Sequence, residues 1–250
     1  MATGTKDYFK AMLLYGLYRG EPIPMACDEQ GRLVLIVEEV SPFTKSGTEI
    51  WRDNFEDGLV KCSYASGGTG ASVAIDTTEA VSGAQSCIMT GGSDGSAYAR
   101  IGYYFPPSTY NKLALEFALR FGANIDHIDI FFTTNDAVNT YKARFRYDWA
   151  DQTWYIENFD ESKFESVLSS MLYLGLPNFF NRFKCVIDIP NGKYHKFVYP
   201  GGSADLTAYN LGTTSPTQFR YATVTISVYS VAGYNAVMLV DDVVITQDES

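Results

Sequence analysis

The sequence has few of the residues on which most catalytic and metal sites depend. It contains two histidines, and its four cysteines, Cys27, Cys62, Cys87 and Cys185, form no Cys-x-x-Cys pair. Closely spaced pairs of Cys or His mark structural zinc sites, so no zinc site is predicted. There is also no P-loop, and no dinucleotide fingerprint followed by a helix. Nucleotide-dependent chemistry is therefore not expected.

Long hydrophobic runs are also missing. The longest, such as Leu33–Val37 and Ala236–Val240, are far too short to cross a bilayer. Lys6, Asp7 and Lys10 interrupt any apolar segment near the start, so no signal peptide is expected. The chain has no Asn-x-Ser/Thr sequon, and its cysteines are scattered among apolar residues. These features favour folding in a reducing cytoplasm with buried thiols, and disulfides are the alternative.

Positive charge is scarce, whereas aromatic residues are abundant. Lys and Arg number 19 against 29 Asp and Glu, which gives a formal net charge of −10. Proteins that bind nucleic acid alone are usually basic, so that function is not expected. Aromatic residues make up 15% of the chain, including 18 Tyr and 16 Phe, and they favour strands over helices.

The first 39 residues have a pattern of their own. Tyr8, Met12 and Tyr15 recur at helical spacing and predict a helix over residues 5–18. A hairpin is predicted next, over residues 23–37. This segment is too small to hold a core alone, so we expect it to dock on a larger body.

From residue 49 onward the pattern is that of strands. Leu113–Phe121, Asp126–Phe132 and Tyr141–Tyr147 each alternate between apolar and more polar side chains. Residues 234–246 are apolar on both faces apart from two aspartates, which predicts a central strand buried on both sides. One stretch, residues 161–174, has helical spacing and predicts a short helix or a helical loop.

Together these patterns predict an all-β protein. Its main part, residues 49–250, is expected to be a jelly-roll β-sandwich, because many strands follow one another at short spacing. Residues 1–39 are expected to form a docking arm of one helix and one β-hairpin. Residues 40–48 are the expected linker.

Two pairs of adjacent carboxylates lie near the two ends of the predicted sandwich. They are Glu56 with Asp57, and Asp241 with Asp242. The first and last strands of a sandwich are often neighbours, so these pairs could meet and supply the oxygen ligands that calcium prefers. The alternative is that the aspartates accept hydrogen bonds from backbone amides or pair with nearby basic side chains. A glycosidase carboxylate pair is a further alternative, although no spacing argues for one.

A mixture of aromatic and basic residues surrounds one predicted hairpin. Such a mixture is what a glycan-binding surface uses. The candidates are Arg144, Arg146, Tyr147, Trp149 and Trp154. The alternative is that these aromatic residues cover a sheet face or a subunit contact, where Tyr, Trp and Arg also concentrate.

One segment, Gly91–Gly95, matches Gly-x-Ser-x-Gly. A nucleophile elbow needs a helix after the serine, and the residues that follow here are strand-like. We therefore expect a hairpin loop and no catalytic serine. The chain is predicted not to be an enzyme.

Three short segments of the main part carry a further pattern. They are Asn-Phe-Glu-Asp-Gly at 54–58, Gly-Ala-Gln-Ser at 83–86 and Leu-Val-Asp-Asp-Val-Val-Ile at 239–245. This pattern resembles the jelly-roll carbohydrate-binding modules, which open with a Phe-Glu-x-Gly-like stretch and end on an aliphatic-Asp-Asp-Val strand. The resemblance covers about Glu49–Gln247 and implies glycan binding, with a structural calcium ion as the cofactor. Cys87 departs from it, standing where these modules have a leucine-like residue.

The N-terminal part carries a different pattern, over Tyr8–Gly16, Ile23–Asp28 and Gly31–Ile36. It is similar to the N-termini of uncharacterised virion proteins of tailed bacteriophages, with a short helix, a proline-containing strand, an Asp turn and a Gly-Arg-Leu-aliphatic run. The resemblance implies an arm that anchors a sandwich on a particle. Its anchoring side chains would be Phe9, Met12, Leu13, Leu17, Ile23 and Leu33.

The leading prediction is a non-enzymatic structural protein of a tailed-phage virion, assembled in the host cytoplasm. It is expected to be a capsid decoration protein, or else a neck or tail component. Its expected partners are other virion proteins and further copies of itself, without nucleic acid or membrane. The alternative is a glycan-binding module, a lectin-like jelly roll that recognises host surface polysaccharide.

Overall fold

A computed structural model describes residues 14–18, 21–27, 33–34, 47–106, 111–135, 138–168, 179–215 and 221–249. The chain divides into two units, Met1–Ser41 and Pro42–Ser250. Every regular element in the described ranges is a β-strand. Within those ranges, accordingly, nothing forms a helix that could span a membrane.

The first unit contains a three-stranded antiparallel sheet in the order β1–β2–β3. Its strands are β1 (Leu14–Tyr18), β2 (Glu21–Cys27) and β3 (Leu33–Val34). Cys27 pairs with Leu33, so the expected hairpin is confirmed. The expected helix is wrong for residues 14–18, which pair along their whole length with β2. Their backbone groups are satisfied by a neighbouring strand, and Tyr and Leu suit that geometry. Residues 5–13 of the expected helix, with Phe9, Met12 and Leu13, lie outside the described residues.

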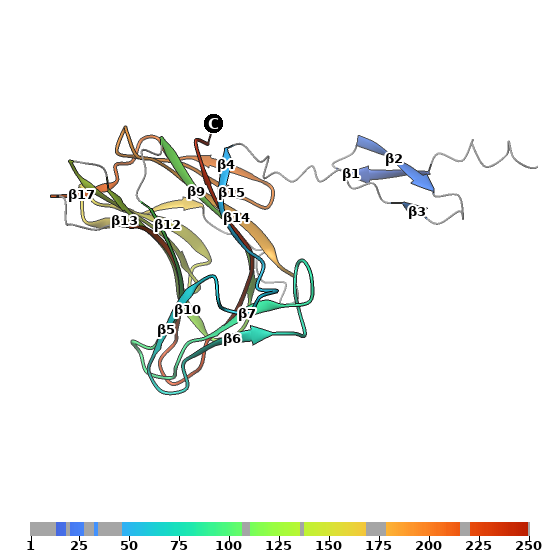
Figure 1. Ribbon diagram of the computed structural model, residues 1–250, viewed down its shortest axis with the longest axis horizontal. Helices are drawn as coiled ribbons and strands as arrows, with labels where there is room; N and C mark the ends of the chain where they lie inside the picture. Colours follow the sequence, from blue (N-terminus) through green and yellow to red (C-terminus); the bar gives the residue numbers. More distant parts are fainter. Residues whose placement is uncertain are drawn as a thin grey trace, which may run out of the picture. The chain divides into compact units, whose positions relative to one another are not determined.

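The second unit is a sandwich of two antiparallel sheets, which Figure 1 shows as two facing layers. We name each sheet after one of its central strands. The β10 sheet has the order β13–β12–β11–β10–β18–β8–β5, with β17 beside β11. Its strands are β5 (Ser63–Gly67), β8 (Tyr98–Phe105), β10 (Ile125–Asn135), β11 (Thr140–Asp148), β12 (Thr153–Asn158), β13 (Lys163–Leu168), β17 (Gly212–Thr214) and β18 (Ala222–Ser230).

The β19 sheet has the order β16–β15–β14–β9–β19–β7–β6, with β4 also beside β19. Its strands are β4 (Thr48–Asp53), β6 (Ser72–Asp76), β7 (Ser86–Thr90), β9 (Lys112–Phe121), β14 (Asn181–Asp188), β15 (Lys193–Tyr199), β16 (Gly202–Asp205) and β19 (Val237–Gln247). The predicted all-β sandwich is therefore confirmed.

The core lies between the two sheets and follows the alternation of the sequence. The apolar face of β9 is buried, as is that of β10. Aromatic rings fill the middle: the ring of Trp154 lies 4.8 Å from that of Phe197 and 5.1 Å from that of Phe183. Removing this apolar surface from water is the main force that holds the sheets together.

The predicted central strand is confirmed, and β19 has an additional feature. Along one edge, Met238–Asp241 and Val244–Gln247 pair with β9. Along the other, Val237–Val240 pairs with β7 and Val243–Gln247 pairs with β4. The change occurs at Asp241 and Asp242, where the ladder to β9 has a register shift and Asp242 has a φ of 48°. The end of β19 lies beside β4 (Figure 1).

Two smaller expectations have different outcomes. The helix expected over 161–174 is wrong for its first part, because Lys163–Leu168 forms strand β13 at the edge of the β10 sheet. Gly91–Gly95 lies in a loop, as expected, but the expected hairpin is wrong, because this loop joins β7 of the β19 sheet to β8 of the β10 sheet. Cys62, Cys87 and Cys185 are free thiols.

Candidate functional site

The solvent side of the β10 sheet carries an unusual number of aromatic and charged side chains. Burial alternates along its strands, so every second residue points away from the core. We call this surface the outer face. Its residues include Tyr98, Arg100, Gly102, Tyr104, His127, Asp129, Phe131, Lys142, Arg144, Arg146, Tyr155, Glu157, Phe164, Thr223, Thr225, Ser227 and Tyr229.

Asp129 lies at the centre of the outer face and is only 3% exposed. Arg146 donates to it through Nε at 2.8 Å and Nη2 at 3.0 Å, and Arg144 donates through Nη2. The two guanidinium groups also lie over the ring of Phe164, at 4.4 Å for Arg146 and 5.5 Å for Arg144. Charge-assisted hydrogen bonds and cation–π contacts together fix both arginines.

The carboxyl of Asp129 is held in its ionised form. Burial alone would raise its pKa, but hydrogen bonds from His127, Arg146 and Arg144 outweigh that effect and hold the pKa well below its ordinary value of 3.8. One carboxylate is shared by two arginines, and Glu157 lies 3.7 Å from Arg144. This part of the face is therefore rigid and strongly polar.

A row of rings lies beside this charged group. His127 and Tyr229 face each other across β10 and β18, and their rings are stacked with centroids 4.2 Å apart. Tyr98 follows on β8, 6.2 Å from Tyr229. Arg100 lies 5.2 Å from the Tyr98 ring and donates from Nε to Ser227 Oγ at 2.9 Å. Neighbouring strands thus present a continuous aromatic edge.

A second aromatic pair lies farther along the same strands. Tyr104 and Tyr221 are more than half exposed, and their rings meet edge to face at 6.3 Å. Tyr104 is six residues beyond Tyr98, which is about 20 Å along a strand. Between the two aromatic groups the row across β8 and β18 holds Gly102 and Thr225, whose side chains are small. The outer face therefore has a low central strip with rings on both sides.

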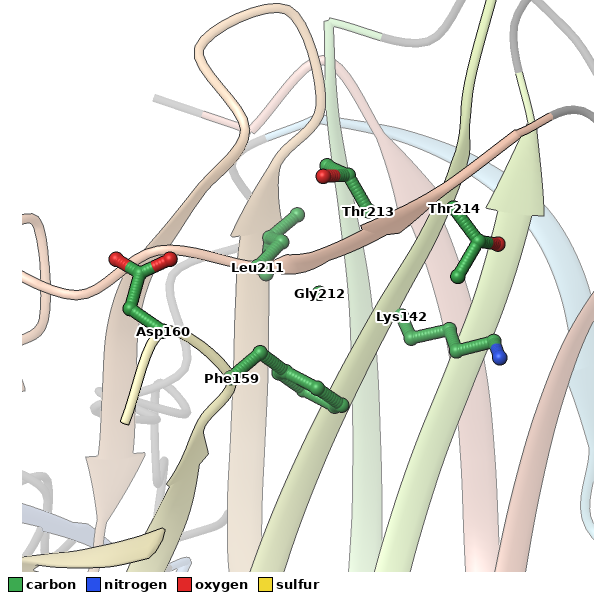
Figure 2. Close-up of a pocket in the computed structure, with 7 residues that line it drawn as sticks. All are labelled: Lys142, Phe159, Asp160, Leu211, Gly212, Thr213 and Thr214. Atoms are coloured by element: carbon green, nitrogen blue, oxygen red, sulfur yellow. The ribbon is translucent and has the colours of Figure 1, made fainter. Parts of the chain in front are cut away.

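A shallow pocket of about 230 Å³ lies at one end of the outer face (Figure 2). It forms where β12 ends and β17 takes its place beside β11. Its lining consists of Lys142, Phe159, Asp160, Leu211, Gly212, Thr213 and Thr214. A Cβ at Gly212 would lie 2.5 Å from the Phe159 ring, so the ring position requires glycine there. Asn210 donates a hydrogen bond to the Asp160 carboxylate.

The structure divides the five predicted glycan-binding residues between two environments. Arg144 and Arg146 lie on the outer face, whereas Tyr147 is 1% exposed and Trp154 is fully buried, both in the core. Trp149 is partly buried and packs against the core. The alternative interpretation, in which these aromatic residues cover a sheet face, describes Tyr147 and Trp154.

Sequence reasoning missed the other members of the outer face. His127, Tyr229 and Tyr98 come from segments that are far apart in sequence. Their grouping depends on β18 lying between β10 and β8, which no local pattern reveals. The position of Tyr147, in contrast, could have been predicted from the sequence. Neighbouring residues of a strand point to opposite faces, so Tyr147 must point into the core if Arg144 and Arg146 point outward.

The predicted calcium ligands hold a loop in place. Asp241 Oδ2 accepts from the backbone N–H groups of Val81 at 2.6 Å and Ser82 at 3.3 Å. Glu56 Oε1 accepts from those of Ala84 at 2.7 Å and Gln85 at 2.8 Å. Burial raises the pKa of Asp241, and these hydrogen bonds oppose that effect. Both carboxylates thus clamp the segment between β6 and β7.

The other two predicted ligands have basic partners. Asp242 accepts from the Ser82 hydroxyl and from Arg182, and Asp57 pairs with Lys61 at 2.8 Å. Across the described ranges, no three His, Cys, Asp or Glu side chains are grouped in a way that would hold a metal ion. Calcium binding stays a prediction. The contacts of Asp241 agree with the alternative, in which the aspartates accept hydrogen bonds from backbone amides.

Comparison with known proteins identifies the fold. No protein-family model and no curated protein matches the chain. Among solved structures, the cellulose induced protein Cip1 is similar with a TM-score of 0.53 and 17% identity, over 78% of this chain and 96% of Cip1.

Two further solved structures are less similar. Lectin UEA-II complexed with galactose has a TM-score of 0.49 and 12% identity, over 80% of this chain and 99% of the lectin. A carbohydrate esterase from Shiga toxin-encoding bacteriophage phi24B has a TM-score of 0.49 and 10% identity, over 81% and 100%. At these identities the likeness concerns fold alone, and the second unit is a jelly-roll β-sandwich of the kind seen in Cip1.

Proposed function

We propose that this protein binds a glycan on the outer face of the β10 sheet. The observation that carries the proposal is the row of rings formed by His127, Tyr229 and Tyr98 beside the buried carboxylate of Asp129. Aromatic rings offer apolar surface to the C–H groups of a sugar, and charged groups nearby bind its hydroxyls. A ligand surface of this kind combines apolar area with a few fixed polar groups.

The rigidity of the face supports the same function. Asp129 is held by Arg144 and Arg146, and both arginines rest on Phe164. Side chains already fixed in one arrangement lose little conformational entropy when a ligand binds. The rings of His127 and Tyr229 are likewise held by their mutual stacking.

The test is a glycan array followed by calorimetry with the full chain. Tyr229→Ala and Tyr98→Ala should each weaken binding at least about tenfold, because a lost ring removes 1.4 kcal/mol or more. Tyr234→Ala is the matched control, since Tyr234 is 58% exposed but lies in the loop before β19. Equal loss in all three variants, or an array without signal, would overturn the proposal.

Attachment to a phage particle is a separate prediction that rests on the docking arm. Leu17, Ile23 and Leu33 lie on the three strands of the first unit. Deleting residues 1–39 should abolish saturable binding to empty capsids while the sandwich stays folded. Retained binding would contradict the anchoring role.

Absence of enzymatic activity also stays a prediction. Any glycan found on the array should be incubated with the protein and assayed for new reducing ends. Release of reducing ends that is lost on substitution of Asp129 or Glu157 would instead establish a polysaccharide-degrading enzyme. Unchanged glycan would agree with a binding module.

A further inference from the structure

The charges along β11 are ordered from one end of the outer face to the other. Lys142, Arg144 and Arg146 point outward in turn, and Asp148 ends the strand. Arg144 and Arg146 are neutralised by Asp129, and Glu157 lies near Arg144. Lys142, in contrast, forms no ion pair with any carboxylate in the part of the chain that the structure describes. Among the three cationic side chains of β11, Lys142 at the pocket end is therefore the one without a carboxylate partner in the described ranges.

This cation stands at a concave site. Figure 2 shows Lys142 and Asp160 on opposite sides of the Phe159 ring. Asp160 accepts a hydrogen bond from Asn210, whereas the Lys142 side of the pocket is lined by the exposed hydroxyl side chain of Thr214. Thr213, the preceding residue of β17, projects to the opposite side of the strand. The Lys142 side of the pocket thus offers a ring face, one hydroxyl and one ammonium group, and the Asp160 carboxylate lies on the other side of the ring.

We propose that the glycan is acidic and that the pocket binds an anionic sugar unit through Lys142. The inference rests on the proposed function and specifies its ligand. The apolar face of the sugar ring would lie on Phe159, one of its hydroxyls would bond with Thr214, and its anionic group would accept from the Lys142 ammonium. A charge-assisted hydrogen bond is about twice as strong as a neutral one, so it can select between an acidic and a neutral sugar.

The protein is acidic overall, so a preference for an acidic glycan would point to a local cation. At a net charge of −10 the chain repels polyanions at long range, so their binding requires a local cation. The contact at Lys142 is short-range, and added salt screens it over about 8–10 Å. The preference for an acidic glycan is therefore expected to decrease as sodium chloride is raised.

The test compares sugars that differ only in charge. Cello-oligosaccharides are paired with the same oligosaccharides after oxidation of the primary hydroxyls to carboxylates. Homogalacturonan oligosaccharides are paired with their methyl esters. Cello-oligosaccharides sulfated at the primary hydroxyl form a third arm, which distinguishes a carboxylate from a sulfate as the source of the charge.

The variants are Lys142→Gln, Lys142→Arg and the control Lys61→Gln. Lys61 lies in the turn between β4 and β5 and pairs with Asp57. Wild type and Lys61→Gln should bind the charged member of a pair about tenfold more tightly, a difference of 1.4 kcal/mol. Lys142→Gln should lose that preference while binding the neutral member unchanged, and Lys142→Arg should retain it. Thermal unfolding of each variant verifies the fold.

The outcomes separate the two proposals. Binding of neutral and charged members with equal affinity would overturn this inference and leave glycan binding in place. A preference for the charged sugar that persists in Lys142→Gln would also overturn it, because a group other than Lys142 would then bind the anionic group. Wild-type protein that binds no member of any pair would overturn this inference, and the glycan array then decides whether glycan binding itself stands.

Discussion

The imidazole of His127 lies flat on the ring of Tyr229, with 4.2 Å between centroids and 14° between planes. The two residues are direct partners in the ladder between β10 and β18. Asp126 and Asp129 flank the imidazole, at 2.7 Å from Nδ1 and 3.6 Å from Nε2. The stack therefore joins the aromatic row of the outer face to its charged centre.

This stack should be measurable as a coupling energy. A double-mutant cycle with His127→Ala and Tyr229→Ala should give about 0.5–1.5 kcal/mol of interaction in urea unfolding, the usual value for paired rings. A cycle of Tyr229→Ala with Tyr234→Ala should give no coupling beyond about 0.5 kcal/mol. Equal coupling in both cycles would mean that the stacked geometry does not stabilise the fold.

Trp154 should behave as a core residue. Trp154→Ala should cost about 3–5 kcal/mol of unfolding free energy, because it empties a fully buried site between Phe197 and Phe183. Trp149→Ala should cost clearly less, since Trp149 is only partly buried. Chemical denaturation of both variants gives the comparison. Similar costs would place the two indoles in equivalent surroundings, contrary to the structure.

Asp129 should give a pH-dependent contribution to stability. Its folded pKa lies below the ordinary value of 3.8, so the ionised form adds stability above that pH and loses it as the pH falls through the folded pKa. Asp129→Asn should therefore cost about 1.5–3 kcal/mol at pH 7, the range for charged hydrogen bonds, since both arginines are partly exposed.

The deficit of Asp129→Asn should shrink as the pH is lowered below about 4. Urea unfolding at several pH values measures it. Asp57→Asn is the control, because that carboxylate is 62% exposed and pairs with Lys61 at the surface. A deficit for Asp129→Asn that is independent of pH would argue against an ionised carboxylate at the centre of the outer face.

The two carboxylates that clamp the loop before β7 should be separable by hydrogen exchange. Asp241→Ala should speed exchange of the Val81 and Ser82 amides, whose acceptor it removes. Glu56→Ala should instead speed exchange at Ala84 and Gln85. Acceleration of all four amides in both variants would show that the loop opens as one unit.

Thermal unfolding with and without calcium tests the calcium prediction. Calcium bound at Glu56 and Asp241 would raise the melting temperature in proportion to the logarithm of its excess over the dissociation constant. That rise should disappear in Glu56→Gln. An unchanged melting temperature on adding calcium or a chelator would leave the carboxylates with a purely structural role.

Much of the sandwich could be predicted because alternation is a local property. Leu113, Leu115 and Phe117 share one face of β9 and are buried, as their spacing requires. The central position of β19 followed from its apolar run, which only Asp241 and Asp242 interrupt. Both conclusions depend only on residues near one another in sequence.

The errors arose where a local pattern fits two structures. Phe164, Val167 and Leu168 have the spacing of one helical face, yet they lie on β13, whose pairing with β12 shifts register near Trp154. A bulge of this kind changes which residues share a face, and it imitates a helical period. The outer face was incomplete for another reason, since Tyr98 and Tyr229 become neighbours only through the order of strands.

The change of neighbours along β19 also bears on how the sandwich assembles. Among the strands described, β19 alone joins β9 on one side to both β7 and β4 on the other. Those two groups of strands cannot form one sheet until β19 has been synthesised and inserted between them. Pairings so distant in sequence fold slowly, within milliseconds to seconds. During synthesis, the open edges of β9, β7 and β4 are therefore the surfaces that need protection from other chains.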